Sequence, residues 1–259
     1  MPKRIADKAI KFYKAGNYES AIDEFTRILE TEGDNAEVYN NMGLCYANLG
    51  NDEKAEDYFL KAQSLNPKLP QVYINLADIY YKQKDFDSGI QLLAQGSYEM
   101  PQNMVMRHYL ARFYMEDARL DMAIDELETI LEHQPNNYDA YYDLGRVHFE
   151  LGNYESAISA FEKVLEFKTD NEWIYYYLAE AYEANDNIDK AISNYIKATS
   201  INFNFPFPFK KLGILFMARG DFESSIEYFE DYLKKDLAQE EKNNIEKLVA
   251  NLKLKVNRG

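Results

Sequence analysis

Few side chains in this sequence have the types and spacing that catalysis or metal binding requires. The 259 residues include three histidines and a single cysteine, Cys45. No two histidines have the spacing of a zinc site, and no glycine-rich loop could hold a phosphate, so we predict neither a metal nor a cofactor. Carboxylate pairs abound, but 44 Asp and Glu residues make such pairs unavoidable. We therefore predict that the chain is not an enzyme.

The charge balance argues against two classes of partner. Lys and Arg number 29, so the formal net charge is −15. Nucleic acids and anionic membranes attract basic proteins, and neither is expected as a partner. The charge is uneven, because residues 1–16 hold five basic side chains and one acidic, and residues 234–259 hold seven and four.

Compartment signals are sparse. No apolar run is long enough to cross a membrane, and the first residues lack the apolar core of a signal peptide. One cysteine excludes an internal disulfide framework. A cytoplasmic protein is the expectation.

Small and large residues recur every 34 positions without an insertion. One small column contains Ala21, Ala55, Gly89, Ala123, Ala157, Ala191 and Ser225. Four positions later lie Phe25, Phe59, Leu93, Leu127, Phe161, Tyr195 and Phe229. A second small column (Ala9, Gly43, Ala77, Ala111, Gly145, Ala179, Gly213) is followed three positions later by Phe12, Tyr46, Tyr80, Tyr114, His148, Tyr182 and Phe216. These spacings place small and large residues on one helix face, so each unit is predicted to form two amphipathic helices.

The histidines and the cysteine fit this pattern as structural residues. His148 stands in the ring column and is expected to be packed and hydrogen-bonded. His133 lies at a predicted helix end, where a basic group suits the helix dipole. Cys45 is expected to be a small buried hydrophobe. His108 is expected to face a groove, either touching a partner or solvated.

The columns resemble the tetratricopeptide repeat family, whose pattern has an aromatic, Leu-Gly or Leu-Ala, Tyr, Ala, Phe and Pro at fixed offsets. The fifth unit matches through Tyr141, Leu144, Gly145, His148, Ala157 and Phe161. The resemblance implies an all-α fold, a right-handed superhelical solenoid of antiparallel helix pairs. The seven expected repeats are 2–35, 36–69, 70–103, 104–137, 138–171, 172–205 and 206–239. Residues 240–259 should form a C-terminal capping helix and tail, because Ile245, Val249 and Leu252 lie on one apolar stripe.

In proteins that the chain resembles, the first helix of each repeat lines a concave groove that holds a partner peptide. The residues expected to face this groove are Asn41, Asn75, Asp78, His108, Tyr109, Arg112, Tyr142, Asp143, Arg146, Phe149, Trp173, Tyr176, Tyr177 and Glu180. Asn41 and Asn75 are expected to stack as a ladder. Arg112 and Arg146, also 34 apart, are expected to bind an acidic group, while the aromatic residues bind apolar anchors. Packing of these aromatic side chains against each other is the alternative.

Two further features bear on the partner. Part of the family binds acidic chaperone tails through Lys, Asn and Arg at fixed positions. Only Asn41 is retained in the first three repeats, so such an adaptor is not expected. The run Phe203–Phe209 holds four phenylalanines and two prolines, which either pack in the joint between repeats or form an apolar patch.

We therefore predict a non-catalytic protein-protein interaction scaffold or adaptor that holds a peptide or domain in its groove. One alternative is a self-assembling scaffold, a head-to-tail homo-oligomer joined through its basic ends. Another is a regulatory subunit of an enzyme complex.

Overall fold

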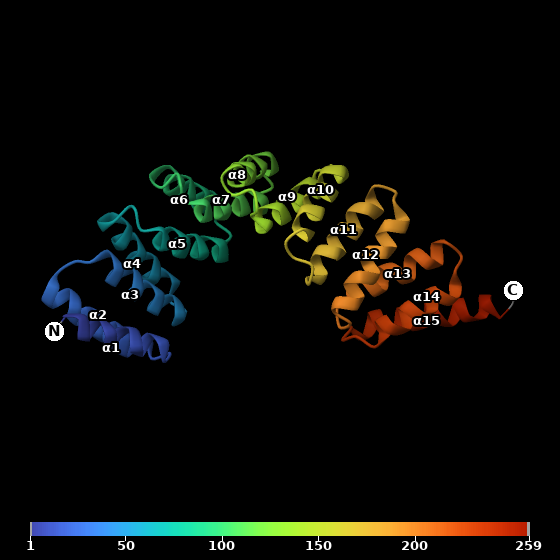
Figure 1. Ribbon diagram of the computed structural model, residues 1–259. Coiled ribbons are helices and arrows are strands. Elements are labelled where there is room, and N and C mark those ends of the chain that lie inside the picture. Colours follow the sequence, from blue (N-terminus) through green and yellow to red (C-terminus); the bar gives the residue numbers. More distant parts are fainter. Residues whose placement is uncertain (1, 258–259) are drawn as a thin grey trace. The chain divides into compact units, whose positions relative to one another are not determined.

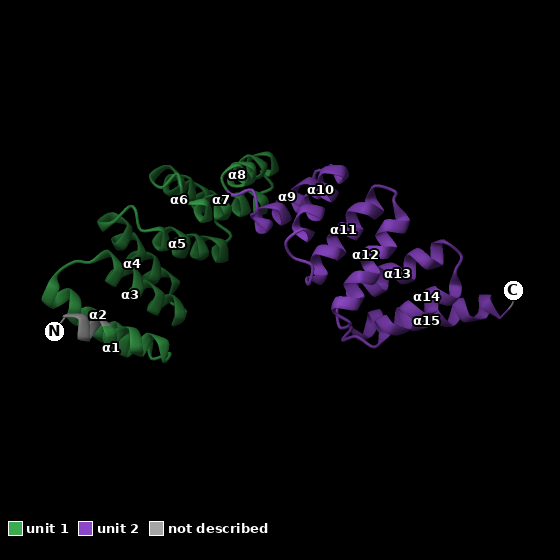
Figure 2. Ribbon diagram, viewed as in Figure 1, with its two compact units in different colours: residues 1–133 green, residues 134–259 purple. Residues whose placement is uncertain are grey.

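The computed structural model describes the backbone of residues 2–257 and the side chains of residues 7–257, and all regular secondary structure in this part of the chain is α-helical (Figure 1). The helices divide into two compact units, residues 1–133 and residues 134–259 (Figure 2). The first unit contains α1 (Pro2–Lys14), α2 (Tyr18–Glu32), α3 (Ala36–Asn48), α4 (Asp52–Leu65), α5 (Pro70–Gln83), α6 (Phe86–Glu99), α7 (Met104–Glu116) and α8 (Leu120–His133). The second contains α9 (Tyr138–Glu150), α10 (Tyr154–Leu165), α11 (Glu172–Ala184), α12 (Ile188–Ile201), α13 (Pro206–Ala218), α14 (Phe222–Leu233) and α15 (Gln239–Val256).

Within each unit, helices that follow one another pack as pairs. The closest associations are α1 with α2, α3 with α4, α9 with α10, α11 with α12 and α13 with α14. The first helices of successive pairs also touch, because α5 contacts both α3 and α7, and α11 contacts α9. The predicted all-α fold of helix pairs is confirmed.

Side-chain caps set where many of the helices begin. Asn17 accepts a hydrogen bond from the backbone N–H of Ser20, and Asn51 and Asp85 cap α4 and α6 in the same way. Asn35 and Asn103 cap first helices through the N–H groups of Val38 and Met106. A cap satisfies one of the backbone donors that the first turn leaves unpaired.

The turn inside each pair uses a left-handed residue. Gly16, Gly50, Gly152 and Gly220 have φ of 75–77°, as the turn requires. The same column holds Lys84, Ala118 and Asp186, also at positive φ. At Ala118, a β-carbon stands where glycine would be unstrained.

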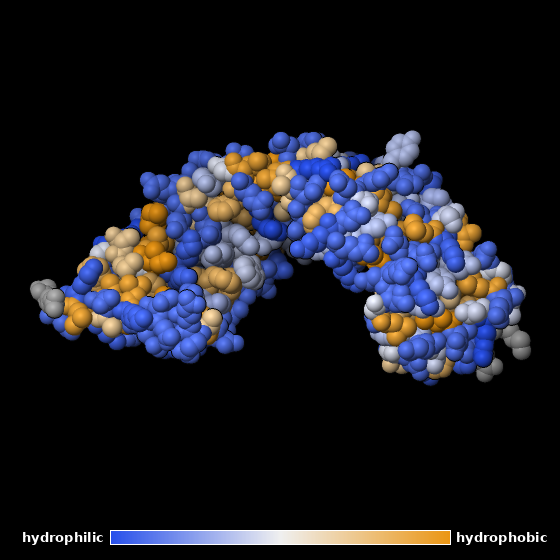
Figure 3. All heavy atoms as spheres, turned by 180° about the vertical axis from the view of Figure 1, so that it is seen from behind, coloured by the Kyte–Doolittle hydropathy of each residue, from blue (hydrophilic) through white to orange (hydrophobic). Residues whose placement is uncertain are grey.

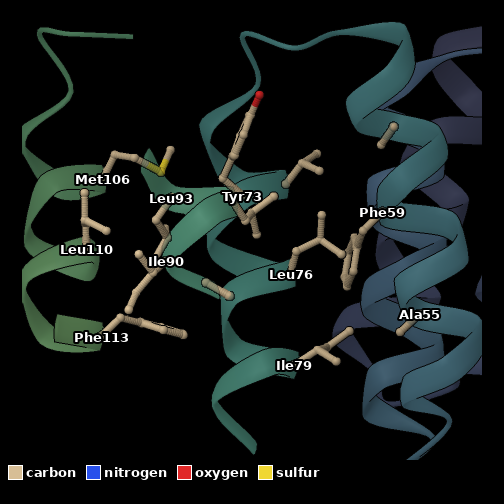
Figure 4. Packing of buried hydrophobic residues seen from close by; sticks show 14 residues of the cluster. Ala55, Phe59, Tyr73, Leu76, Ile79, Ile90, Leu93, Met106, Leu110 and Phe113 are labelled. Atoms are coloured by element: carbon tan, nitrogen blue, oxygen red, sulfur yellow. The ribbon is translucent and has the colours of Figure 1, made fainter. Parts of the chain in front are cut away.

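The predicted small and large columns form the core. In the first unit, Leu76 of α5 points toward Phe59 of α4, and Ala55 lies one helical turn along α4 from Phe59 (Figure 4). Phe113 of α7 lies against α6, where a β-carbon added to Gly89 would fall 2.0 Å from its ring. In the second unit Phe161 and Tyr195 are fully buried, and the Ser225 hydroxyl donates to the Gly213 carbonyl at 2.7 Å.

The last helix covers the end of the second unit. Ile245, Val249 and Leu252 of α15 are buried against Phe229 and Tyr232 of α14. Lys210 of α13 donates to Glu241 of α15 at 2.7 Å, which ties the same helix to a second partner. This packing agrees with the apolar stripe expected there, while the exact repeat boundaries stay a prediction. No helix among the described residues is long and apolar enough to cross a membrane.

Candidate functional site

The residues predicted to face a partner all lie on first helices, and the structure gives them different surroundings. Asn41, Asn75, His108, Tyr109, Tyr142, Arg146, Phe149, Tyr176, Tyr177 and Glu180 are half-buried. Asp78, Arg112 and Trp173 are exposed, and Asp143 is buried. Arg112 and Arg146 belong to different units, so their predicted pairing stays a prediction.

The first unit brings three of these residues into one pocket. Asp78 of α5 and Tyr109 and Arg112 of α7 line a cavity of about 210 Å³, together with Tyr81 and Phe113. Burial raises the pKa of Asp78, although its neighbours Lys82 and Arg112 oppose the shift. Asp78 as a whole residue is exposed to solvent. The rise in its pKa therefore reflects protein atoms packed near the carboxyl group, which reduce its hydration without covering the residue.

The predicted stacking of Asn41 with Asn75 stays a prediction, and the amide to which Asn75 donates is that of Asn40. Asn75 donates to the Oδ1 of Asn40 at 2.9 Å, and Asn40 is buried. The two residues are 35 apart, one more than the repeat length. The rings of Tyr142 and Tyr177, also 35 apart, meet at 5.9 Å in the second unit. Successive first helices are therefore shifted slightly along each other at these contacts, so the amide that reaches Asn75 comes from Asn40 rather than Asn41.

The second unit carries a continuous cluster of rings, which we call the aromatic surface: Tyr142 of α9, Trp173, Tyr176 and Tyr177 of α11, and Phe205 and Phe207 at the start of α13. The Trp173 ring lies 4.5 Å from that of Phe205, 5.9 Å from Tyr177 and 5.8 Å from Phe207. Aromatic pairs at such distances stabilise each other beyond simple area burial. The rings thus pack together, and Trp173 and Phe207 are the most exposed of these residues, at 38% and 49%.

A charged network borders the aromatic surface. Lys211 of α13 lies 2.7 Å from Glu180 and 3.3 Å from Glu183, both on α11. The Tyr195 hydroxyl lies within hydrogen-bond distance of both Glu180 and, at 2.7 Å, Glu183, and its one proton is shared between them. Burial alone would lower the pKa of Lys211, but the two carboxylates outweigh it and raise that pKa. Glu180 therefore already has partners within the unit.

Tyrosine hydroxyls in the same region are held in the neutral form. Burial raises the pKa of Tyr142 to about 12, and the nearby Tyr177 adds to the shift. Burial also raises the pKa of Tyr176, with the Glu180 charge as the next cause. These hydroxyls stay protonated near neutral pH, where they can donate hydrogen bonds.

Two further predicted residues of α9 have partners within the second unit. Arg146 lies 3.6 Å from Asp143, of which only 7% is exposed. The Phe149 ring lies 5.7 Å from that of Tyr154. Arg146 thus already has a carboxylate neighbour, whereas Arg112 makes no ion pair with any described residue.

The run Phe203–Phe209 combines the two arrangements expected of it, because some of its rings are packed and others form an exposed apolar patch. Phe205 and Phe209 are buried, while Phe203 and Phe207 are exposed. Sequence reasoning missed what anchors the run. The Lys235 ammonium lies 3.2 Å from the centre of the Phe203 ring and 4.0 Å from that of Phe209, and it donates to the Phe203 carbonyl. Burial lowers the pKa of Lys235. None of the repeat columns predicts that this lysine contacts the Phe203 and Phe209 rings.

His133 and Cys45 lie as expected. The His133 ring nitrogen is 2.9 Å from the Thr129 carbonyl at the end of α8, and Cys45 is buried. Burial raises the pKa of the Cys45 thiol to about 11, so it is a thiol near neutral pH. His148 is half-buried within its ring column.

Other surface features are less specific. Orange apolar spheres interrupt a mainly blue, polar surface on both units (Figure 3). Shallow depressions of about 440 and 370 Å³ lie along Gln134–Asp139 and between α14 and α15, and neither contains a predicted residue. The described part of the chain holds no cluster of three or more His, Cys, Asp or Glu side chains arranged for a metal ion.

Family models match most of the helix pairs. Models described as tetratricopeptide repeat match residues 36–69, 70–97, 114–159 and 174–205, and one described as TPR repeat matches residues 145–186. The matched segments together cover more than half of the chain.

Curated relatives match over shorter stretches. The photosystem I assembly protein Ycf3 of Acaryochloris marina is 35% identical over 95 residues, which cover 32% of this chain and 57% of that protein. The type IV pilus assembly protein PilF of Pseudomonas aeruginosa is 28% identical over 102 residues, 36% of this chain and 39% of the relative. The chain spans about half the length of the Ycf3 proteins that it matches.

Solved structures extend the likeness to nearly the whole chain. The crystal structure of MamA matches with a TM-score of 0.58 and 26% identity, covering 61% of this chain and 92% of that one. The C-terminal part of a TPR repeat-containing protein from Cytophaga hutchinsonii has a TM-score of 0.75 and 18% identity, covering 92% and 98%, and it supports the fold alone. From the repeat columns, the helix pairs and these matches together, the chain belongs to the tetratricopeptide repeat family.

Proposed function

We propose that this chain is a non-catalytic interaction scaffold that holds a segment of a partner protein against its first helices. The aromatic surface of the second unit carries this proposal. It combines a half-exposed phenylalanine and an exposed tryptophan, two residue types with large contact area, with tyrosine hydroxyls that remain donors. Interfaces obtain most of their binding energy from such residues.

The surroundings support one kind of segment. Trp173 and Phe207 offer area for apolar anchors, while the ion-paired Glu180 and Lys211 offer a polar border. Repeat proteins of this class present many weak contacts along stacked helices, which suits an extended or helical segment. The names of two relatives, assembly proteins for photosystem I and for the type IV pilus, support a role in bringing other proteins together.

The remaining predicted residues extend the proposed surface along other first helices. On the second unit these are Asp143, Arg146 and Phe149. On the first unit they are Asn41, Asn75, Asp78, His108, Tyr109 and Arg112. A head-to-tail oligomer and a regulatory subunit remain alternatives that no contact described above favours.

A displayed library of random peptides, screened against the full chain, tests the proposal. Trp173 is the only tryptophan, so its emission reports binding at the aromatic surface directly. We expect selected peptides to shift that emission to the blue as they cover the indole. Phe207→Ala should weaken their binding by about tenfold or more, the range of a binding hot spot.

Phe167 provides the matched control. Its ring is 45% exposed in the second unit, close to the value for Phe207, but it belongs to no ring pair of the aromatic surface. Phe167→Ala should leave affinity unchanged. Selection of no peptide, or equal losses in the two variants, would show that the aromatic surface does not bind segments.

A further inference from the structure

The pocket between α5 and α7 in the first unit differs in kind from the aromatic surface. Five side chains line it: Asp78 and Tyr81 from α5, and Tyr109, Arg112 and Phe113 from α7. Its volume of about 210 Å³ lies below the roughly 300–1,000 Å³ typical of sites for whole small ligands. The space suits a single side chain with its backbone passing across the opening.

The wall of the pocket is aromatic and firmly held. The rings of Tyr81 and Phe113 meet edge to face at 5.8 Å, and the Phe86 ring lies 6.0 Å from Tyr81 and 6.2 Å from Phe113. Phe113 is buried, while 40% of Tyr81 remains exposed. Gly89 permits this arrangement, because a β-carbon there would collide with the Phe113 ring. An apolar side chain entering the pocket would therefore find a preformed wall.

The rim of the pocket carries one cation that lacks a close partner. Arg112 is exposed and forms no salt bridge within the described residues, although its charge acts on Asp78. Lys82, the next cation along α5, already lies 3.5 Å from Asp52. A guanidinium presents several N–H donors in a planar fork that matches a carboxylate. Asp78 offers an acceptor beside it, suited to a backbone N–H.

We propose that this pocket binds an apolar residue of a partner segment whose neighbour is Asp or Glu, with that side-chain carboxylate on Arg112. The apolar side chain lies against Tyr81 and Phe113, and a backbone N–H of the segment donates to Asp78. The proposal rests on the proposed function, since it assumes a segment held along the first helices. It assigns to the first unit a charge-selective site, distinct from the largely apolar contacts of the second.

Three peptides, two of them capped at both ends, test this site on the full chain by two-dimensional NMR titration. The probes are acetyl-Gly-Phe-Glu-Gly-amide, the same peptide with Gln in place of Glu, and acetyl-Gly-Gly-Phe with a free C-terminal carboxylate. We expect the Glu peptide to bind about tenfold more tightly than the Gln peptide, the value of one charge-assisted hydrogen bond. The Arg112 side-chain N–H signal should shift on binding.

Variants separate a direct contact from a general charge effect. Arg112→Gln should abolish the difference between the Glu and Gln peptides. Arg119→Gln, which removes another arginine of the same unit, should preserve it. Equal affinity of the two capped peptides, or a difference that survives Arg112→Gln, overturns the proposal. Tight binding of the free-carboxylate peptide alone also overturns it, because the carboxylate would then come from a chain end.

The two proposals fail in distinguishable ways. Loss of Glu selectivity while library peptides still shift the Trp173 emission refutes only the pocket. Glu-selective binding in the first unit without any peptide at the aromatic surface refutes the role proposed for the second unit.

Discussion

The indole of Trp173 on α11 and the ring of Phe207 on α13 lie 5.8 Å apart, in the same position of two successive repeats. The repeat thus brings two large, partly exposed rings from different helices to one place. Phe205 completes the cluster: it is buried, and its ring lies 4.5 Å from that of Trp173.

Phe207→Ala should expose the indole even without a partner. We expect the Trp173 emission to shift to the red and the free energy of unfolding to fall by about 1 kcal/mol, the typical worth of an aromatic pair. Fluorescence and urea unfolding measure both. Phe167→Ala should leave the emission unchanged, and an unshifted spectrum in the Phe207 variant would contradict the packing.

Gly89→Ala should destabilise the first unit although alanine is the better helix former. Its β-carbon would fall 2.0 Å from the Phe113 ring, and overpacking of this kind costs about 1–3 kcal/mol. Thermal unfolding followed by circular dichroism measures the loss.

A second substitution checks the cause. Elsewhere the Gly89 column holds Ala55 and the Phe113 column holds Ile79, 34 residues earlier in each case. Adding Phe113→Ile to Gly89→Ala should therefore restore most of the stability. If the double variant is no more stable than Gly89→Ala, the collision is not the reason for the loss.

Ala118→Gly should stabilise the protein. Ala118 has a φ of 56°, where a β-carbon costs about 1–2 kcal/mol, and the greater freedom of glycine in the unfolded chain offsets part of the gain. We expect a net increase of about 0.5–1 kcal/mol in urea unfolding. Gly152→Ala places alanine at a φ of 75° with no atom near the new β-carbon, so it should lower stability through the backbone alone. Changes of the same sign in both variants would refute the argument.

Glu241 should make the attachment of α15 sensitive to acid. The hydrogen bond from Lys210, helped by one from Tyr232, lowers the pKa of Glu241 in the folded chain. A lowered carboxyl pKa contributes stability above the unfolded value, and this contribution is lost as the pH falls through the folded value. Glu241→Gln should therefore cost about 0.5 kcal/mol at pH 7, as expected for a partly exposed ion pair, and less at pH 3.

Urea unfolding of the wild type and the Gln variant at both pH values measures this difference. Comparing the two chains at each pH cancels the effect of the other carboxyl groups. If the difference in unfolding free energy between the two chains is equal at pH 7 and pH 3, or larger at pH 3, Glu241 does not have the lowered pKa described here.

Local patterns in the sequence predict most of the framework. The columns that contain Ala55 and Phe59 recur because the two helices of every unit pack against each other in the same way. Both residues are buried, as expected. The caps could also have been read from sequence, since Asn17, Asn51 and Asp85 recur at the repeat length before second helices. These features depend on neighbours within one or two turns, which a periodic sequence places identically each time.

The periodic sequence predicts the helix pairs and their family, and it places Trp173 and Arg112 on first helices. Which side chains meet across neighbouring helices follows only from the tertiary structure: Asn75 donates to Asn40, Lys211 pairs with Glu180, and the Lys235 ammonium lies over the Phe203 ring. Such contacts depend on the shift and tilt between stacked helices, where one residue of stagger changes a side chain's partner. That geometry arises from the packing of whole helices. The difference between Arg112 and Arg146 is local instead, because Arg146 has Asp143 three positions earlier on its own helix, where Arg112 has Tyr109.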